Sequence, residues 1–337
     1  MATGKDVAER AQVSVATVSR VLNGTGYVNP ALRERVLAAV RDLGYQPSAL
    51  ARGLRTKRTE TVGLVVPQID HPFFGTLAFR LENRLFERGF RCFACSAQER
   101  PEKEEAYVEA LLRQNVDGCL VVPTHSSPSA VDRLRERGVP LVLLDRDVPG
   151  LAVDRVLSDN HSGANALALH LLELGHRDVA MIVRSETSVP IRERERGARA
   201  AFTEAGIRLS VRGTSELDQF EAGHRVALEM LGAPERPTAL MALTDALAIG
   251  ALQAAHELGL DVPRDVSIVG FDDIPLAARV VPALTTVAQD VAAMAAEAVD
   301  LLLARIDDPT LAPTTRVVAT RLVLRRSAGR PPEEPQP

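Results

Sequence analysis

The first residues whose types and spacing indicate chemistry lie near the N-terminus, in a pattern of two short helices joined by a turn. A helix over Lys5–Ala11 would be followed by one over Val15–Asn23, and a second helix set at an angle to the first can lie in the DNA major groove. Arg20 could there donate two hydrogen bonds to a guanine. The residues predicted to contact DNA are Val15, Ala16, Thr17 and Arg20 at base edges and Ser14, Ser19 and Asn23 at phosphates.

The charge distribution favours this interpretation over a small helical cap with a solvated charged face. Residues 1–58 hold ten Lys and Arg against four Asp and Glu, a net charge of +6. The remaining 279 residues hold 30 against 40, a net charge of −10. A cationic segment is the electrostatic footprint of a protein that binds a polyanion, and the overall net charge of −4 conceals it.

Other chemically suggestive residues give weaker patterns. Cys92 and Cys95 form a C-x-x-C, but the surrounding sequence predicts a strand, where residues three apart point to opposite faces. We therefore expect reduced structural thiols. Phosphate-binding loop, dinucleotide and nucleophile-elbow motifs are absent from the sequence, and the histidines lack metal-ligand spacing. The adjacent carboxylates Asp272 and Asp273 rarely converge on one substrate atom, so we expect neither an enzyme nor a cofactor or metal.

The predicted secondary structure changes at Thr61, after the helices of the N-terminal segment. Short β-branched runs there alternate with amphipathic stretches, which is typical of parallel, doubly wound α/β sheets with ligands at the carboxyl ends of the strands. Nine or ten strands over about 265 residues suit two lobes better than one. Strands are predicted at 61–66, 90–95, 118–122, 141–144, 178–183, 239–243 and 266–270, and helices at 74–88, 102–113, 129–137, 161–174, 192–205, 223–231, 246–258 and 291–306.

The composition indicates an ordinary globular chain, with 46% hydrophobic and 25% charged residues. No apolar run approaches the roughly 20 residues that a membrane helix needs. The N-terminal sequence also lacks an apolar signal core. We therefore expect a cytoplasmic protein that does not associate with membranes.

Several motifs closely resemble the lactose/galactose-repressor family of bacterial transcription regulators. The similarity spans about residues 3–327, and its longest ungapped part lies in the head. The motifs include Lys5-Asp6-Val7-Ala8, Val13-Ser14-Val15-Ala16-Thr17-Val18-Ser19-Arg20-Val21-Leu22-Asn23-Gly24, Ala49-Leu50-Ala51-Arg52-Gly53-Leu54, Ser158-Asp159-Asn160, Gly270-Phe271-Asp272-Asp273-Ile274 and Leu284-Thr285-Thr286-Val287.

This resemblance implies an all-α helix-turn-helix head and an α/β body with the two-lobed periplasmic-binding-protein fold. In that fold the chain crosses between the two lobes three times. It also implies a homodimeric repressor that reads a palindromic operator. Leu54, at the end of a hinge helix, would wedge into the minor groove and kink the duplex; the alternative is a core leucine. The implied domains are the head at 1–47, the hinge and linker at 48–59, the body at 60–327 (N-lobe about 60–158 and 287–315, C-lobe about 159–286 and 316–327) and a tail at 328–337.

The resemblance further implies an effector, a sugar or sugar derivative, in the cleft between the lobes. Each matched position has a structural alternative. Phe73 and Phe74 could be core residues, Arg194 could lie on a solvated helix face, and Asp272 and Asp145 could cap a helix or loop. The effector-binding residues implied are Phe73, Phe74, Asp145, Arg194, Thr244 and Asp272.

Two departures from the family pattern bear on the effector. Thr244 stands where many relatives carry asparagine, and an aromatic position of the family aligns with Asp218, two residues before Phe220. Either the effector is more polar than in typical relatives, or Phe220 enters the cleft through a local shift. A periplasmic-type solute-binding protein would share the body, but it predicts an export signal and no basic head.

Overall fold

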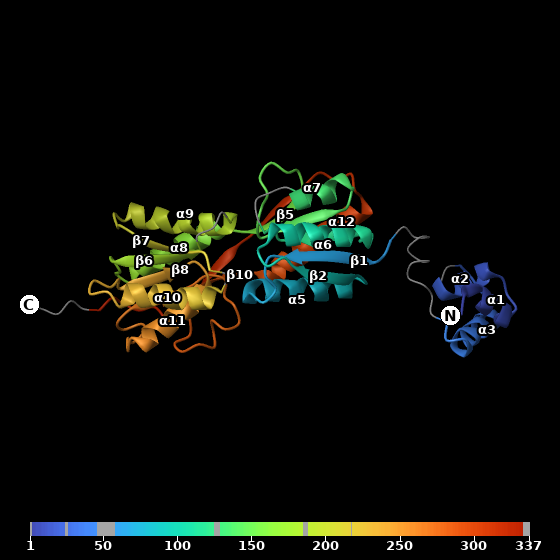
Figure 1. Cartoon of the computed structure of the whole chain (residues 1–337), viewed down its shortest axis with the longest axis horizontal. Helices are drawn as coiled ribbons and strands as arrows, with labels where there is room; N and C mark the ends of the chain where they lie inside the picture. Colours follow the sequence, from blue (N-terminus) through green and yellow to red (C-terminus); the bar gives the residue numbers. More distant parts are fainter. Residues whose placement is uncertain are drawn as a thin grey trace, which may run out of the picture. The chain divides into compact units, whose positions relative to one another are not determined.

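In a computed structural model, the chain forms two compact units, Met1–Glu60 and Thr61–Pro337. Figure 1 shows the chain with colours that follow the sequence. The structure describes residues 2–23, 26–45, 58–124, 129–184, 188–216 and 218–332. The predicted hinge helix and its Leu54 lie outside these residues, as does the side chain of Asn23.

The described part of the head consists of three helices, α1 (Gly4–Ala11), α2 (Val15–Asn23) and α3 (Pro30–Asp42). Thr3 and Asp6 form a reciprocal capping box at the start of α1. Asn29 caps α3 by accepting a hydrogen bond from the Ala31 N–H. Val7, Val18 and Val36, one from each helix, are buried together in the core of the head. The helix-turn-helix pattern predicted for α1 and α2 is confirmed.

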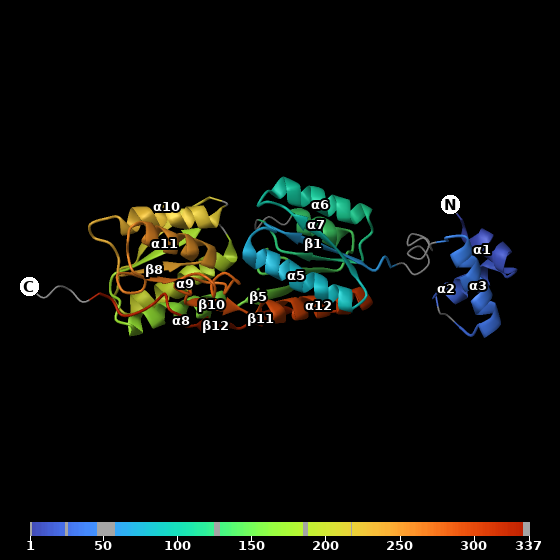
Figure 2. The ribbon, with the colours of Figure 1, turned by 90° about the horizontal axis from the view of Figure 1, so that it is seen from below.

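The first lobe of the body is a six-stranded parallel sheet in the order β11-β5-β4-β3-β1-β2. Helices α5 and α12 cover one face of this sheet and α6 and α7 cover the other (Figure 2). The elements are β1 (Thr61–Val66), α5 (Pro72–Glu87), β2 (Arg91–Ser96), α6 (Pro101–Arg113), β3 (Gly118–Val121), α7 (Ser129–Glu136), β4 (Leu141–Leu144), β5 (Asp154–Ser158), α12 (Val291–Asp307) and β11 (Thr315–Val318).

The second lobe is a four-stranded parallel sheet in the order β7-β6-β8-β9, between the helix pairs α8/α9 and α10/α11 (Figure 1). Strands β10 and β12 form a separate two-stranded antiparallel sheet. The elements are α8 (Asn160–Glu173), β6 (Val179–Arg184), α9 (Val189–Glu204), β7 (Ser210–Thr214), α10 (Gln219–Leu231), β8 (Ala239–Ala242), α11 (Asp245–Glu257), β9 (Ser267–Val269), β10 (Thr286–Gln289) and β12 (Thr320–Val323).

The seven predicted body strands are all present, with ends within one residue, but five further strands were not predicted: β5, β7, β10, β11 and β12. Strand β7 is mostly exposed, and β11 and β12 carry exposed arginines, so these strands lack an apolar signature. Because β11 pairs with β5, the first lobe continues to Val318, three residues beyond the boundary expected at 315.

The cysteines of the C-x-x-C lie on β2, as the sequence predicted. Cys92 packs against the core that includes α5, and Cys95 packs against the core on the opposite face of the sheet. Burial raises the pKa of the Cys92 thiol to about 12. All three cysteines are free, and the two thiols cannot form a redox pair from opposite faces. Within the part of the chain that the structure describes, no helix is long and apolar enough to cross a membrane.

Candidate functional site

The exposed face of α2 carries the residues predicted to read DNA. Val15 is 50% exposed, and Ala16 and Arg20 are also exposed, whereas Val18 and Val21 point into the core. The Ser14 hydroxyl accepts a hydrogen bond from the Thr17 N–H at 3.1 Å, so Ser14 caps the helix. Thr17 and Ser19 are half-buried at the edge of this face.

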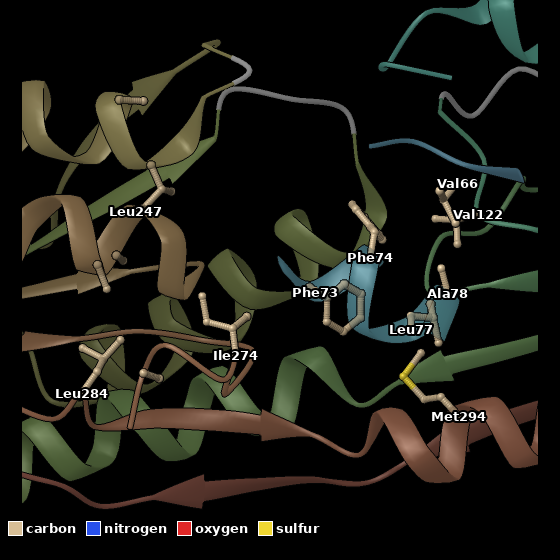
Figure 3. Close-up of a cluster of buried hydrophobic side chains, with 14 of the residues drawn as sticks. Val66, Phe73, Phe74, Leu77, Ala78, Val122, Leu247, Ile274, Leu284 and Met294 are labelled. Atoms are coloured by element: carbon tan, nitrogen blue, oxygen red, sulfur yellow. The ribbon is translucent and has the colours of Figure 1, made fainter. Parts of the chain in front are cut away.

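The six residues predicted to bind the effector line one cavity between the two lobes. They follow the carboxyl ends of β1, β4, β8 and β9 or lie on α9, although they are spread over 200 positions of the chain. Figure 3 shows Phe73 and Phe74 at the start of α5. The cavity has a volume of about 40 Å³.

Arg194 lies at the centre of the second lobe's contribution to this cavity. Its Nη1 is 3.0 Å from the Asp272 Oδ1 and donates to the Leu243 carbonyl oxygen at 2.7 Å. Its Nε donates to the Asn160 Oδ1 at 2.8 Å, and its guanidinium lies 3.9 Å from the centre of the Phe271 ring. Arg194 is only 3% exposed, so the alternative of a solvated helix face is wrong for this residue.

Asp272 is held in place by backbone and side-chain contacts. Its N–H donates to the Val287 carbonyl, and its Oδ1 accepts from the Gln289 amide at 2.8 Å. Its φ of 120° is a conformation that residues with a Cβ rarely adopt, and such strain concentrates at ligand sites. Burial raises the pKa of Asp272 to about 6, although the Arg194 charge opposes the shift.

Two polar side chains in the cavity are buried without full hydrogen bonding. The Asp145 Oδ1 has no hydrogen-bond partner among the described residues, and burial raises the pKa of this carboxyl. Burial lowers the pKa of His71 to about 4, although the nearby Gln219 side chain opposes this shift. Neither ring nitrogen of His71 has a hydrogen-bond partner among the described residues. A neutral imidazole and an under-bonded carboxyl favour a polar ligand that supplies the missing hydrogen bonds.

Sequence reasoning missed several residues that line the cavity, among them His71, Arg146, Arg184, Ser188, Pro190, Ile191 and Gln219. Helix α10 begins at Gln219 rather than at the predicted Gly223, because Asp218 caps it. The Gln219 Oε1 accepts a hydrogen bond from the Thr244 hydroxyl at 2.7 Å. Many relatives carry an asparagine at the position of Thr244. In this protein the neighbouring Gln219 supplies an amide group to the cavity instead.

The alternative in which Phe220 enters the cleft is wrong. Phe220 packs against the hydrophobic core, and the exposed Asp218 accepts hydrogen bonds from the Phe220 and Glu221 N–H groups as a helix cap. Gln219, the residue between them, is 5% exposed and faces the cavity. The first turn of the helix determines that Gln219, and not the next residue, points into the cavity. The Asp-x-x-Glu capping pattern at 218–221 was the sequence signal that could have indicated this helix start.

Asp245, a third buried carboxyl near the site, predicts an unusual pH dependence of stability. Burial raises its pKa to about 8, although it accepts hydrogen bonds from the Thr286 hydroxyl and the Ile274 N–H. Between pH 6.5 and 8 the folded state therefore keeps a proton that the unfolded chain has released, and stability falls as the pH rises. We expect the unfolding free energy of the body to fall by about 1 kcal/mol per pH unit there, and more gently as the pH approaches 8.

Urea unfolding at constant ionic strength across pH 6.5–8.5 would measure this slope. Asp245→Asn is expected to flatten the slope, because the amide does not titrate. The exposed Asp261 provides a matched control, Asp261→Asn, which should leave the slope unchanged. Equal slopes in the wild type and in Asp245→Asn would contradict the prediction.

Comparisons with known proteins agree with this two-part architecture. Residues 3–48 match the description "Bacterial regulatory proteins, lacI family", and residues 168–328 match "Periplasmic binding protein-like domain". The transcriptional regulator DegA of Bacillus subtilis is 38% identical over 296 residues, which cover 87% of this chain and 88% of that protein.

Two solved structures are similar over nearly the whole chain. A complex of the transcriptional regulator CelR with cellobiose has a TM-score of 0.72 and 33% identity and covers 97% of this chain and 100% of its own. A lac repressor dimer bound to operator and the anti-inducer ONPF has a TM-score of 0.87 and 27% identity, covering 97% and 99%. The chain therefore belongs to the LacI family of bacterial regulatory proteins, with that family's DNA-binding head and ligand-binding body.

Proposed function

We propose that the protein is a homodimeric repressor that binds a palindromic operator and is controlled by a sugar or sugar derivative in the interlobe cleft. The observation that carries this proposal is that one cavity between the lobes is lined by the buried residues Phe73, Phe74, Asp145, Arg194, Thr244 and Asp272. Their side chains provide two aromatic faces, a guanidinium and two carboxyls, which together suit a ring that carries hydroxyl groups.

The mechanism is a linkage between the cleft and the heads. The cleft receives side chains from both lobes, so a ligand bound there favours one arrangement of the lobes. If the favoured arrangement brings the two heads of the dimer together on DNA, the ligand acts as a corepressor; if it separates them, the ligand acts as an inducer. A coupling free energy of about 1–3 kcal/mol is sufficient for a switch.

An apolar surface on the first lobe supports the proposed dimer. Phe79 and Phe86 lie seven residues apart on α5, on the same side of the helix, and are 62% and 72% exposed. Phe93 on the edge strand β2 is 49% exposed. Large exposed aromatics of this kind are typical of protein interfaces, and the similar lac repressor structure is a dimer.

The proposed role is that of a receptor in the cytoplasm, with no catalytic step. The relatives that the chain matches are transcriptional regulators. The described residues contain no cluster of three or more metal-ligating side chains.

Arg20→Ala tests the DNA-binding part of the proposal. Selection of bound duplexes from a random pool would first give the operator sequence. We then expect Arg20→Ala to lower the ratio of specific to non-specific affinity by about 5- to 150-fold, because one bidentate base contact is lost. Binding in the cleft should be unaffected, since Arg20 belongs to the head. Retained specificity in the variant would remove Arg20 from base readout.

A further inference from the structure

A short chain of hydrogen bonds at the edge of the cleft begins at Thr244. The Thr244 Oγ1 accepts a hydrogen bond from the Leu247 N–H at 3.3 Å and so caps α11. The hydroxyl proton is donated to the Gln219 Oε1 at 2.7 Å. Because a hydroxyl has a single proton, Thr244 has none left to donate to a ligand. The group on which Thr244 acts is therefore the Gln219 side chain.

The hydrogen bond from Thr244 fixes the orientation of the Gln219 amide. Only the oxygen of an amide accepts a proton, so Oε1 points toward Thr244 and the NH₂ group, with its two donors, is turned away from it. Gln219 is the first residue of α10, is buried, and lines the cavity. A ligand in the cavity therefore meets the donor end of Gln219.

His71 lines the cavity from the first lobe. It directly precedes α5, a position from which a side chain often caps the helix, but its imidazole makes no capping hydrogen bond. It is 8% exposed and packs against Phe74 with 5.3 Å between the ring centres. Neither ring nitrogen has a hydrogen-bond partner among the described residues. A neutral imidazole has one N–H donor and one bare nitrogen that accepts, so a ligand group here must donate as well as accept.

His71 and Gln219 approach each other from opposite lobes. The Gln219 side chain is near enough to influence the pKa of His71, and both residues line the same cavity. The lobes also meet here through two buried side chains. The Nη1 of Arg184, the last residue of β6, lies 3.3 Å from the Oε1 of Glu99, which follows β2. One ligand group placed between His71 and Gln219 therefore contacts both lobes at once.

A hydroxyl group meets both requirements. Its oxygen accepts from the Gln219 NH₂ while its proton is donated to the bare nitrogen of His71, whereas an ionised carboxylate or phosphate oxygen only accepts. We propose that Gln219 and His71 together bind one hydroxyl group of the effector between the lobes, and that Thr244 is a positioning residue that orients Gln219. This proposal rests on the sugar effector proposed above and names the residues that select one of its hydroxyl groups.

Calorimetric titration of the full chain tests the proposal with five neutral sugars as probes: D-ribose, D-xylose, D-glucose, D-galactose and cellobiose. For the sugar that the wild type binds most tightly, we expect Gln219→Leu and His71→Phe each to lower the affinity about tenfold, because each loses a hydrogen bond to the hydroxyl. Phenylalanine at 71 keeps a ring against Phe74. Gln253 on α11 is exposed, so Gln253→Leu is a matched control that should keep the wild-type affinity.

Two further comparisons distinguish a positioning role of Thr244 from a direct contact with the sugar. Thr244→Val keeps the shape of the side chain without its hydroxyl and should also lower the affinity about tenfold, whereas Thr244→Ser keeps the hydroxyl and should restore it to within about threefold of the wild type. The double variant Gln219→Leu/Thr244→Val should bind no more weakly than Gln219→Leu, because Thr244 acts through Gln219. Two independent contacts would instead multiply to a loss of about 100-fold.

The proposal is overturned if the two losses multiply in the double variant, if Thr244→Ser binds as weakly as Thr244→Val, or if Gln219→Leu or His71→Phe keeps the wild-type affinity. Any of these results, obtained with a sugar that the wild type binds, rejects only the roles of these residues and leaves the proposed function standing. A wild type that binds none of the five sugars rejects the sugar effector of the proposed function and this proposal with it. Selection on random duplexes would still decide the DNA-binding part.

Discussion

Replacing Arg194 by methionine is expected to lower the unfolding free energy of the body by about 3–5 kcal/mol. Arg194 is 3% exposed, and its guanidinium is the counter-charge of the equally buried Asp272. The methionine can fill part of the space beside Phe271, but it leaves the Asp272 carboxylate without its cation and the Asn160 Oδ1 without its donor. The same change should abolish the response of operator binding to effector.

Urea unfolding of the full chain, followed through the body transition, would measure this loss. Arg199 gives a matched control on the same helix, because its ion pair with Glu195 is exposed at 48% and 30%. Arg199→Met should cost less than about 1 kcal/mol. The loss in Arg194→Met should also be smaller at pH 5 than at pH 8, since a protonated Asp272 needs no cation. Similar losses in the two variants would reject the buried ion pair as a source of stability.

Gly197→Ala is expected to destabilise the body by about 2–3 kcal/mol, in spite of the better helix propensity of alanine. A Cβ at Gly197 would lie 2.1 Å from the His161 carbonyl oxygen, where α9 packs against α8. Neither backbone can move alone, so the two helices must separate. Arg194 lies one turn before Gly197, and its contact with Asn160 at the start of α8 would lengthen as well.

The unfolding free energy and the effector response should therefore both fall in Gly197→Ala, whereas operator binding in the absence of effector should persist. Arg196, the preceding residue, has a 68% exposed side chain that pairs with Glu193 on the same helix, and Arg196→Ala provides the control. A Gly197→Ala variant with the stability of Arg196→Ala would show that α8 and α9 can separate at little cost.

Much of the fold followed from local signals. Helix α2 has the predicted bounds Val15–Asn23, and the seven predicted strands were correct within one residue. Helix starts were less accurate where the first turn is polar or contains proline, as at Val189 and Gln219. Strands β11 and β12 escaped prediction because an edge strand needs no apolar face, so its sequence carries no period-two signal.

The residues of the candidate site were also predicted only in part from the sequence. Family motifs selected Arg194 and Asp272 individually, and the structure brings them to 3.0 Å of each other. Near Gln219 the Asp-x-x-Glu capping pattern at 218–221 was the available signal, but a helix start predicted at Gly223 made no use of it, and the first turn of α10 decides that Gln219 faces the cavity. Glu99 and Arg184, 85 positions apart, carried no motif at all.

The sequence by itself determined that a cationic head precedes an anionic two-lobed body and which residue types lie at the ends of the strands. Both follow from composition and from periodicities that act over a few residues. Only the tertiary structure decided which charges are buried against one another across the cleft. The energy of an ion pair depends on distance and on exclusion of water, and the packing of two lobes sets both, independently of how far apart the partners lie in the chain.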